Sequence, residues 1–366
     1  MSHFDVLIVG GGIARASLGA EVAAEGRTLI IEAESQCGYH STGRSAAFYL
    51  ESYGGPDVSK LTLASGPFLE HPPVDFSEEG FLSRRGALHL SDGDLPDLPP
   101  AIAVREVGRA ELERMIPGIR PKWVRALLEP GCADIDVARL HAAFLAQFRR
   151  RGGTLMTDRR FQRATRRSGR WHVELGSGDV VTTSLLVNAA GAWADSAAEA
   201  AGVPPLGILP KRRTMVQLRV GRTGIRHLPL VDDAAGTFYF KGETDSSVWL
   251  SPHDEIASDP CDAAPDEIDV AIAIDRFEGV VDWPVERVER SWAGLRSFSP
   301  DRVPVYGFDP VEPGFFWCVG QGGFGIQTSP AAAKLAAAVL LSKSPDAMVA
   351  RIDPDIFSPA RFAAER

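Results

Sequence analysis

A glycine-rich turn near the N-terminus has the residue types and spacing of a dinucleotide site. Gly10–Gly12 follows the apolar run Val6–Val9, and Glu32 ends a second apolar run, Thr28–Ile31, twenty residues after Gly12. A glycine turn at a helix N-terminus accepts a pyrophosphate, and a carboxylate at this spacing binds ribose hydroxyls. The pattern predicts a strand–helix–strand unit that binds FAD or NAD rather than NADP.

Arg15 replaces the third glycine of the G-x-G-x-x-G pattern. That glycine lets the helix pack closely on the strand, so a side chain there is expected to push the helix outward. Overpacking of this kind costs on the order of 1–3 kcal/mol, which loosens a site more readily than it abolishes one. A strand–helix–strand unit without a ligand is the alternative.

Two later loops combine glycines with hydrogen-bonding side chains. The segment HSTGRSAAF is expected to start a helix where Ser41, Thr42, Arg44 and Ser45 meet an anion, although ordinary helix capping explains the same residues. The segment QGGFGIQTS, residues 321–329, is expected to start a C-terminal helix. Such a helix N-terminus suits the electron-rich end of a reduced flavin, and glycines required only for packing are the alternative.

Two arginines have the apolar and aromatic neighbours expected of a desolvated carboxylate site. Arg296 lies in WAGLRSF, and Arg213 ends PKRR where a strand is expected to begin. A guanidinium binds a carboxylate through two parallel hydrogen bonds. The phenols of Tyr53 and Tyr239 can add donors, whereas a surface salt bridge is the usual role of a single arginine.

The whole chain has the composition of a globular enzyme. It has 366 residues, of which 45% are hydrophobic and 24% charged, and its net charge of −9 disfavours nucleic acid and anionic membranes as partners. Its four cysteines are scattered without metal-type spacing, so we expect free thiols, no metal and a cytoplasmic location. We also expect no signal peptide and no membrane span, because a strand begins close to Met1 and no apolar segment is long enough.

Units of strand, glycine turn and helix occur at the start, in the middle (LLVNAAGAWAD) and at the end of the chain, with β-rich inserts between them. This pattern predicts an α/β (α+β) fold in which a Rossmann-like FAD-binding domain is interleaved with a β-rich substrate-binding domain. The first domain would comprise residues 1–80, 132–205 and 290–366, and the second residues 81–131 and 206–289. The acidic segment 266–279 is a candidate helix within the second domain.

Seven segments, in this order and spacing, resemble the D-amino acid oxidase-like flavoproteins, and in particular their D-arginine dehydrogenase branch. These are GGGIA, EAESQCGYHSTGRSAA, LLVNAAGAWAD, LPKRRT, FYFK, WAGLRSF and FFWCVGQGGFGIQTS, which together span nearly the whole chain. The resemblance implies noncovalent FAD and a small-molecule amino acid substrate, oxidised at its Cα–N bond by hydride transfer to flavin N5. Water then hydrolyses the resulting imino acid. The electron acceptor and any catalytic base stay unassigned.

The resemblance also implies which residues contact each ligand. FAD would be bound by Gly10, Gly12, Ile13, Glu32, Ser41, Thr42, Arg44, Ser45, Ala46, Gly191, Gly322, Gly323, Gly325, Ile326, Gln327 and Thr328. The substrate would be held by Tyr53, Arg213, Tyr239, Arg296 and Gly323.

Four pocket positions depart from the D-arginine dehydrogenase pattern. Ala87 stands where that branch has a glutamate for the distal cation, and Phe48 and Leu50 replace a histidine and a threonine on a helix expected to face the flavin. These three changes remove polarity and predict a substrate with an apolar side chain. Asp232 changes the pocket in the opposite direction, because it places a carboxylate where the branch has an apolar residue. It either binds a substrate ammonium or faces solvent.

Two other functions are compatible with these residues. Paired arginines bind the carboxylate of glycine, sarcosine, another secondary amine or a 2-hydroxy acid equally well, so an FAD-dependent oxidase or dehydrogenase of these is one alternative. The other is a catalytically silent flavoprotein whose cofactor site is damaged by Arg15.

Overall fold

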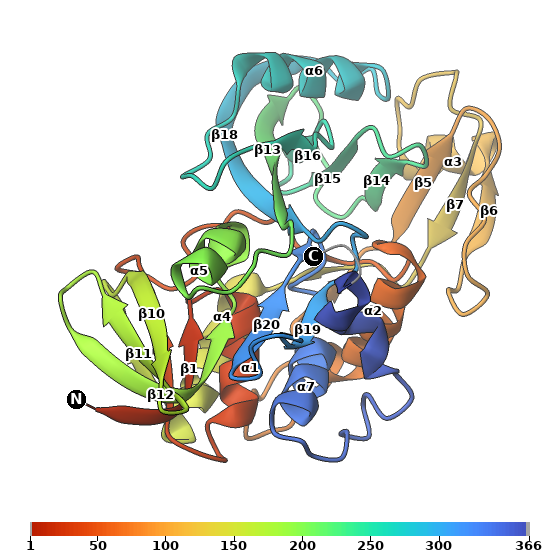
Figure 1. Ribbon diagram of the computed structural model, residues 1–366. Helices are drawn as coiled ribbons and strands as arrows, with labels where there is room; N and C mark the ends of the chain where they lie inside the picture. Colours follow the sequence, from red (N-terminus) through yellow and green to blue (C-terminus); the bar gives the residue numbers. More distant parts are fainter. Residues whose placement is uncertain (1, 364–366) are drawn as a thin grey trace.

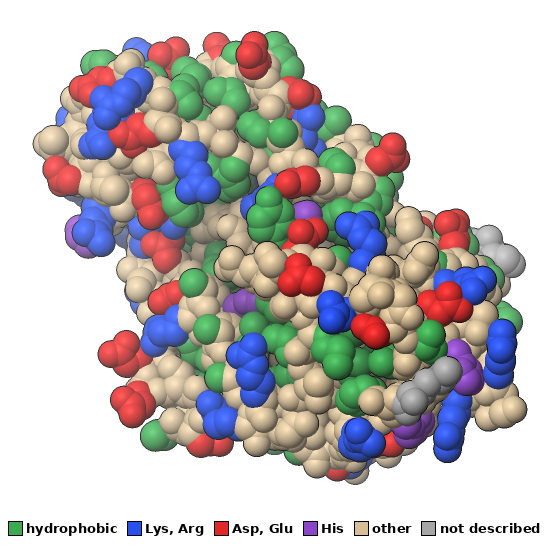
Figure 2. Space-filling model, turned by 90° about the vertical axis from the view of Figure 1, so that its left-hand side faces the viewer, with side chains coloured by type: hydrophobic (Ala, Val, Ile, Leu, Met, Phe, Trp, Pro, Cys, Tyr) green, Lys and Arg blue, Asp and Glu red, His purple; other side chains and the backbone are tan. Residues whose placement is uncertain are grey.

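The structure, a computed structural model, describes residues 2–363 and is built around two large β-sheets in two lobes (Figure 1). The lobe that contains β1 (His3–Val9) and α1 (Ile13–Val22) also contains Phe362, which packs in one core with Leu7 of β1. On the face seen in Figure 2, basic and acidic side chains are intermixed, without a large patch of one sign. None of the helices formed by the described residues is long and apolar enough to cross a lipid bilayer.

The first sheet has eight strands in the order β10-β11-β12-β1-β2-β9, and β20 pairs with β12 and β19. Parallel pairs join β1 to β2 and β12, β2 to β9, and β12 to β20. The other strands are β2 Thr28–Ile31, β9 Thr154–Met156, β10 Phe161–Arg167, β11 Arg170–Leu175, β12 Val180–Asn188, β19 Val305–Phe308 and β20 Phe315–Val319. β2 and β20 are buried along their whole length, as the continuous apolar runs predict.

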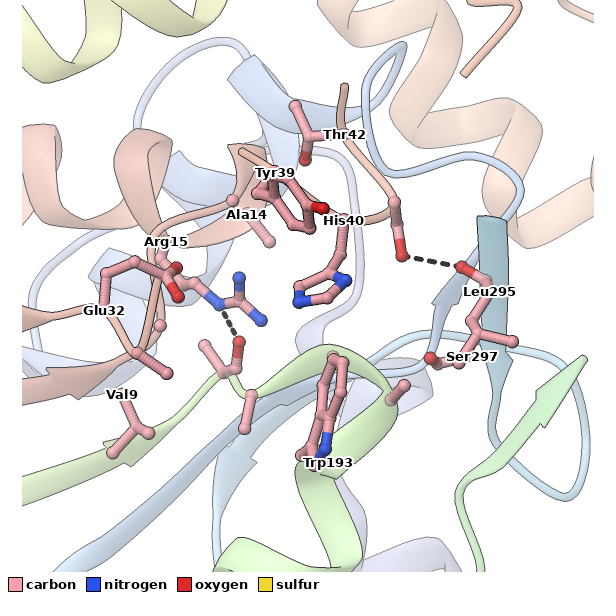
Figure 3. Close-up of a pocket in the computed structure, with 18 of the residues that line it drawn as sticks. Val9, Ala14, Arg15, Glu32, Tyr39, His40, Thr42, Trp193, Leu295 and Ser297 are labelled. Carbon is pink, nitrogen blue, oxygen red and sulfur yellow. Dashed lines mark hydrogen bonds between the residues drawn. The ribbon is translucent and has the colours of Figure 1, made fainter. Parts of the chain in front are cut away.

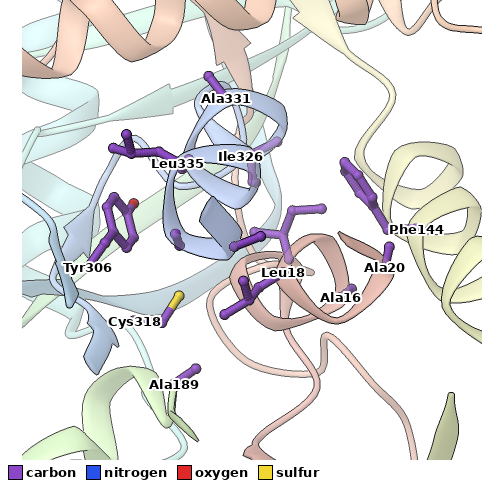
Figure 4. Close-up of a cluster of buried hydrophobic side chains, with 14 of the residues drawn as sticks. Ala16, Leu18, Ala20, Phe144, Ala189, Tyr306, Cys318, Ile326, Ala331 and Leu335 are labelled. Carbon is purple, nitrogen blue, oxygen red and sulfur yellow. The ribbon is translucent and has the colours of Figure 1, made fainter. Parts of the chain in front are cut away.

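Helices cover both faces of this sheet because successive residues of a strand point to opposite sides. Val6 and Ile8 of β1 face a core shared with α1, α4 and α7 (Figure 4), whereas Leu7 and Val9 face a core that includes α5. Small residues on α1 and α7 allow these two helices to pack closely. The helical elements of this lobe are α2 Gly55–Glu70, α4 Val137–Arg150, η1 Gly191–Trp193, α5 Ala194–Ala200, α7 Ser329–Leu340, η2 Pro354–Phe357 and η3 Pro359–Phe362.

The second sheet has ten strands in the order β21-β18-β13-β16-β15-β14-β5-β7-β6, with β17 on β13. These are β5 Ala87–Ser91, β6 Arg105–Gly108, β7 Arg125–Glu129, β13 Leu209–Val220, β14 Leu230–Asp233, β15 Tyr239–Gly242, β16 Ser247–Ser251, β17 Ile256–Ala257, β18 Val285–Phe298 and β21 Gln321–Gly322. The acidic segment forms α6 (Glu267–Glu278), and both α6 and α3 (Arg109–Met115) contribute side chains to the core of this lobe. β18 pairs with β13 on both sides of residue 290, where the sequence pattern suggested a domain boundary.

The predicted helix start at Ser41–Ser45 was wrong. Residues 38–44 form turns, and the chain continues into β3 (Phe48–Tyr49), which pairs with β8 (Ala133–Ile135) and through it with β4 (Leu82–Arg84). Phe48 therefore lies on a strand and Leu50 directly after it, not on a helix. The polar groups of the loop are used in tertiary contacts rather than a cap, since Ser41 Oγ donates to the Leu295 carbonyl at 2.7 Å.

Candidate functional site

A cleft of about 410 Å³ lies at the carboxyl ends of β1, β2 and β12 (Figure 3). Open parallel sheets bind their ligands at this edge because the loops that follow the strands converge there. Of the predicted FAD contacts, the cleft is lined by Gly10, Gly12, Ile13, Glu32, Ser41, Thr42, Ser45, Gly191, Gly322, Gly323, Gly325 and Ile326. Segments distant in the sequence thus meet around one elongated space.

Four predicted FAD contacts lie outside this cleft. The Arg44 guanidinium donates to the Ala293 carbonyl at 3.2 Å and pairs with Asp262, so it joins the 38–45 loop to β18. Ala46 and Gln327 line a smaller neighbouring cavity, and Thr328 is buried in the turn before α7, where its Oγ1 donates to the Phe324 carbonyl at 2.9 Å.

Glu32 provides a buried carboxylate at one end of the cleft. It is 9% exposed, one of its oxygens accepts the Glu34 N–H at 3.0 Å, and it forms no ion pair with the described residues. Thr42 Oγ1 accepts the Ile13 N–H at 3.1 Å and thereby holds the 38–45 loop against the first turn of α1. A carboxylate that is desolvated but unpaired is suited to the hydroxyls of a ribose.

Arg15 projects into the cleft (Figure 3) instead of lying between α1 and the sheet. Its Nε donates to the Ala189 carbonyl, and its two Nη atoms make no hydrogen bond or ion pair within residues 2–363. The guanidinium lies over Gly10 and Gly12, and one Nη atom is 3.1 Å from the position that a Cβ would take on Gly191. Burial lowers the pKa of Arg15, and the charge of Glu32 opposes this shift. The expected outward push on the helix is thus replaced by a cation inside the cleft.

A second cavity of about 90 Å³ adjoins the cleft, and Arg296, Gly323 and Ile326 are among the residues that line both spaces. Of the predicted substrate residues, this cavity is lined by Phe48, Tyr53, Arg213, Asp232, Tyr239, Arg296 and Gly323, together with Leu50. Ala87 does not line it. Ala87 is fully buried and packs behind the wall with Leu50 and Leu230.

The two predicted arginines come from adjacent antiparallel strands. Arg213 of β13 lies opposite Gly294 of β18, two residues before Arg296, so the two guanidinium groups are diagonal neighbours on the sheet. Arg213 Nε donates to the Asp254 carbonyl at 2.8 Å. Arg296 is 7% exposed, and its guanidinium makes no hydrogen bond or ion pair with the described residues. Burial lowers the pKa of Arg296, so the structure contains a desolvated cation that faces the cavity without a partner.

Tyr239 brings a phenol to the same wall as the arginines. Its hydroxyl donates to Met215 Sδ at 3.0 Å. Burial raises the pKa of Tyr239, although the charges of Arg213 and Arg296 oppose the shift, so the phenol stays protonated. The predicted donors Tyr239, Arg213 and Arg296 therefore gather around one small cavity.

His253, which the sequence did not single out, also lines this cavity. Its backbone has a left-handed φ of 53°, and its Nδ1 lies 2.6 Å from the Gly236 carbonyl. Burial, with the charge of Arg213, lowers the pKa of His253 to about 4. The imidazole is consequently neutral, with Nδ1 as the donor to the carbonyl and Nε2 as an acceptor.

His89 lies behind the cavity wall and bridges two carboxylates. Its Nδ1 is 3.1 Å from Asp232 Oδ2, and its Nε2 is 3.1 Å from Glu129 Oε2. Burial lowers the pKa of His89, but the two carboxylates outweigh burial and raise it to about 10. The alternation of ALHLS puts His89 on the same strand face as Ala87, and this was the sequence signal that could have identified it.

Comparisons with known proteins agree with this arrangement. The chain matches the DAO family model, described as FAD dependent oxidoreductase, over residues 5–339. It is 25% identical, over 92% of its length, to the Bos taurus protein named FAD-dependent oxidoreductase domain-containing protein 1, of which 81% is covered.

Two solved structures share the fold. L-proline dehydrogenase from P. horikoshii has a TM-score of 0.82 at 19% identity, with 100% of this chain and 99% of that chain covered. Glycine oxidase from Geobacillus kaustophilus has a TM-score of 0.79 at 20% identity, with coverages of 96% and 98%. Since the family model spans most of the chain, the protein belongs to the DAO family of FAD-dependent oxidoreductases.

Proposed function

We propose that this oxidoreductase converts a D-amino acid with a small apolar side chain to the imino acid, with FAD held noncovalently in the cleft. The observation that carries the proposal is the buried and unpaired guanidinium of Arg296, which faces a small cavity beside the cleft. A desolvated cation of this kind requires an anionic ligand, and a substrate carboxylate supplies one.

The residues of the cleft fit a dinucleotide. Glu32 would accept hydrogen bonds from ribose hydroxyls, Thr42 holds the 38–45 loop against α1, and the backbone of Gly322–Ile326 would contact the flavin. Arg15 fills space over Gly10 and Gly12, where a pyrophosphate would approach the backbone. The site thus retains most of its contacts but carries one obstruction.

The second cavity fits a small amino acid. Arg296 and Arg213 bind the carboxylate, and Phe48, Leu50 and Leu230 surround the side chain with apolar surface. The preference for the D enantiomer is supported only by the resemblance of these segments to the D-arginine dehydrogenase branch, while Ala87 in place of a glutamate argues against D-arginine itself.

The protein contributes orientation to the reaction. When FAD is bound, it supplies the hydride acceptor at flavin N5. The arginines hold the carboxylate so that Cα faces the boundary between cavity and cleft, where Arg296, Gly323 and Ile326 line both. Hydride departure requires the amine to be neutral, and no side-chain base is required for the hydride itself.

Glycine, sarcosine or a 2-hydroxy acid is the second candidate class. The small volume of the cavity, about 90 Å³, favours such compact substrates. The glycine oxidase with the same fold is named for one of them. In a catalytically silent protein, by contrast, Arg15 would keep FAD out of the cleft.

One experiment separates these possibilities. Purified protein is mixed anaerobically with D- and L-amino acids, N-methyl amino acids and 2-hydroxy acids, and bleaching of the flavin absorbance is recorded. We expect small apolar D-amino acids to bleach the flavin fastest. Faster bleaching by an L-amino acid or a 2-hydroxy acid would contradict the proposal, and protein that takes up no FAD would support the silent alternative.

A further inference from the structure

The cavity beside the cleft has two chemically different sides. Arg213, Arg296 and the phenol of Tyr239 present hydrogen-bond donors, whereas Asp232 and His253 present acceptors. The proposed function uses the donor side for a carboxylate. The acceptor side has no assigned role, although it places a negative charge in the same cavity as the two arginines.

Asp232, His89 and Glu129 form a hydrogen-bonded charged triad that crosses three strands. In register, Asp232 of β14 lies opposite His89 of β5, and β5 pairs with β7, which ends at Glu129. Glu129 is 0% exposed, and its Oε1 accepts the Glu51 N–H at 2.8 Å. One imidazolium between two carboxylates leaves a net charge of −1, and a buried uncompensated charge is costly unless a cation joins it.

Among the described cations near this triad, Lys241 and Arg213 are already paired elsewhere, and Arg296, which lines the same cavity, is assigned to the substrate carboxylate. Lys241, which lies over the Phe48 ring, pairs with Asp134 at 2.9 Å and with Glu243 at 3.5 Å. Arg213 contacts the 254–255 segment. Asp232 Oδ1 makes no hydrogen bond of good geometry within residues 2–363, although His89 Nδ1 is 2.9 Å away. The carboxylate therefore has bonding capacity left for a ligand.

His253 adds a neutral acceptor next to Asp232. In the sheet, Asp232 lies opposite Tyr239, and Tyr239 opposite Ser251, so the turn that begins after Ser251 brings His253 to the same edge. A carbonyl can only accept, so the contact with Gly236 fixes the proton on His253 Nδ1. Nε2 then carries a lone pair, and it has no partner among the described residues.

We propose that the Asp232 carboxylate, positioned by His89 and Glu129, binds a protonated amino nitrogen of the substrate, with His253 Nε2 as the second acceptor. This inference rests on the proposed function, because it assumes that the arginines bind the carboxylate of the same molecule. It restricts the substrate class to amino carboxylates and excludes 2-hydroxy acids as good ligands. The nitrogen is the α-amino group, which binds as the ammonium and gives its proton to the Asp232 carboxylate before the hydride leaves.

The test compares achiral carboxylates that differ in one group. Glycine, glycolate and propionate carry an ammonium, a hydroxyl and a methyl group, respectively, on the carbon next to the carboxylate. In a second, longer pair, 4-aminobutyrate and pentanoate carry an ammonium and a methyl group at the far end of the chain. Dissociation constants are measured on the FAD-loaded protein from the flavin absorbance change on rapid anaerobic mixing, before any reduction. For the wild type we expect glycine to bind at least tenfold more tightly than propionate and glycolate.

Asp232→Asn should reduce this preference to less than threefold while the affinity for propionate stays within threefold of the wild type. His253→Phe should lower the affinity for glycine severalfold and leave propionate nearly unchanged. Asp245→Asn is the matched control, since the Asp245 carboxylate accepts the Gly224 N–H at 3.0 Å in a turn of the same lobe and does not line the cavity. It should preserve the preference for glycine.

Equal binding of glycine and propionate by the wild type would overturn the inference. So would an Asp232→Asn variant that weakens all carboxylates alike. A larger preference within the longer pair would place the bound nitrogen on the side chain and would overturn the assignment to the α-amino group. If no carboxylate binds the wild type, or if Arg296→Met leaves propionate binding unchanged, the carboxylate assignment itself fails and this inference fails with it.

Discussion

Arg15 Nε donates a hydrogen bond to the Ala189 carbonyl, which joins the first turn of α1 to the end of β12 across the floor of the cleft. The side chain that replaces a packing glycine therefore does not wedge the helix away from the sheet. It occupies the space over Gly10 and Gly12 that a dinucleotide would use. Removal of the Arg15 side chain is the most direct test of whether the cleft binds FAD.

Arg15→Gly should tighten FAD binding. The substitution clears the approach to the backbone and relieves a steric cost of about 1 kcal/mol or more, which corresponds to a Kd lower by about fivefold or more. Quenching of flavin fluorescence on titration into apoprotein measures this, with Arg15→Lys as a control that keeps a long cation. Weaker binding by Arg15→Gly, with a smaller dependence on salt, would instead mean that the guanidinium binds the pyrophosphate.

FAD should be released intact when the protein is denatured. The Cys318 thiol and His40 are candidate tethers, but burial raises the pKa of Cys318 to about 12, and His40 lies 3.1 Å from the Glu34 carboxylate. A protonated thiol is a poor nucleophile. Acid precipitation followed by absorbance measurement of the supernatant checks this prediction, which fails if yellow colour stays in the pellet.

Arg296→Met should lower kcat/KM for the best substrate by about a hundredfold, because loss of one cation from a desolvated carboxylate costs roughly 2–5 kcal/mol. Bound FAD should be unchanged, as judged by its absorbance ratio to protein. Arg302→Met is a suitable control, since Arg302 pairs with Glu255 at 2.8 Å and is half exposed. Activity of Arg296→Met within a few fold of the wild type would contradict the assigned role.

D-leucine or D-alanine should be a better substrate than D-arginine. Ala87, Phe48 and Leu50 provide no partner for a buried guanidinium, and burial of an unpaired cation costs several kcal/mol. The ratio of kcat/KM values, measured with an artificial acceptor, should exceed ten. If D-arginine is preferred and Asp232→Asn abolishes that preference, Asp232 has taken over the role of the missing glutamate.

His89 should stabilise the fold at neutral pH and lose this effect in alkali. Its pKa is raised from 6.5 to about 10 in the folded protein, so its contribution is complete below pH 6.5 and is lost as the pH rises through 10. His89→Gln should lower the thermal midpoint at pH 7, because it leaves the buried Glu129 and the partly exposed Asp232 without their cation. The difference in midpoint between the two proteins should shrink by most of its value between pH 7 and pH 10.5. A difference that is independent of pH would show that His89 contributes by packing alone.

Local sequence patterns determined the elements around the cofactor cleft. The apolar run Val6–Val9, the glycines after it and Glu32 specify strand, turn, helix and acid within about thirty residues, and interactions of such short range do not depend on the rest of the fold. The start of α4 is likewise fixed by a local contact, because the Asp136 carboxylate accepts the Arg139 N–H at 3.0 Å. The helix wrongly expected at Ser41–Ser45 is the exception, because the Leu295 carbonyl and the pairing of β3 with β8 compete for those residues.

Only the tertiary structure decided the direction of the Arg15 side chain and the existence of an acceptor side in the second cavity. His89, Glu129 and Asp232 come from three strands far apart in the sequence, and they meet because β5 pairs with β7 on one side and with β14 on the other. His253 lies in the same cavity as Asp232 because of a turn in which its φ is 53°, and no sequence motif predicts this turn. Buried charges of this kind are stabilised by partners that only strand pairing brings within reach, so a sequence read along its length shows each of them as an isolated polar residue.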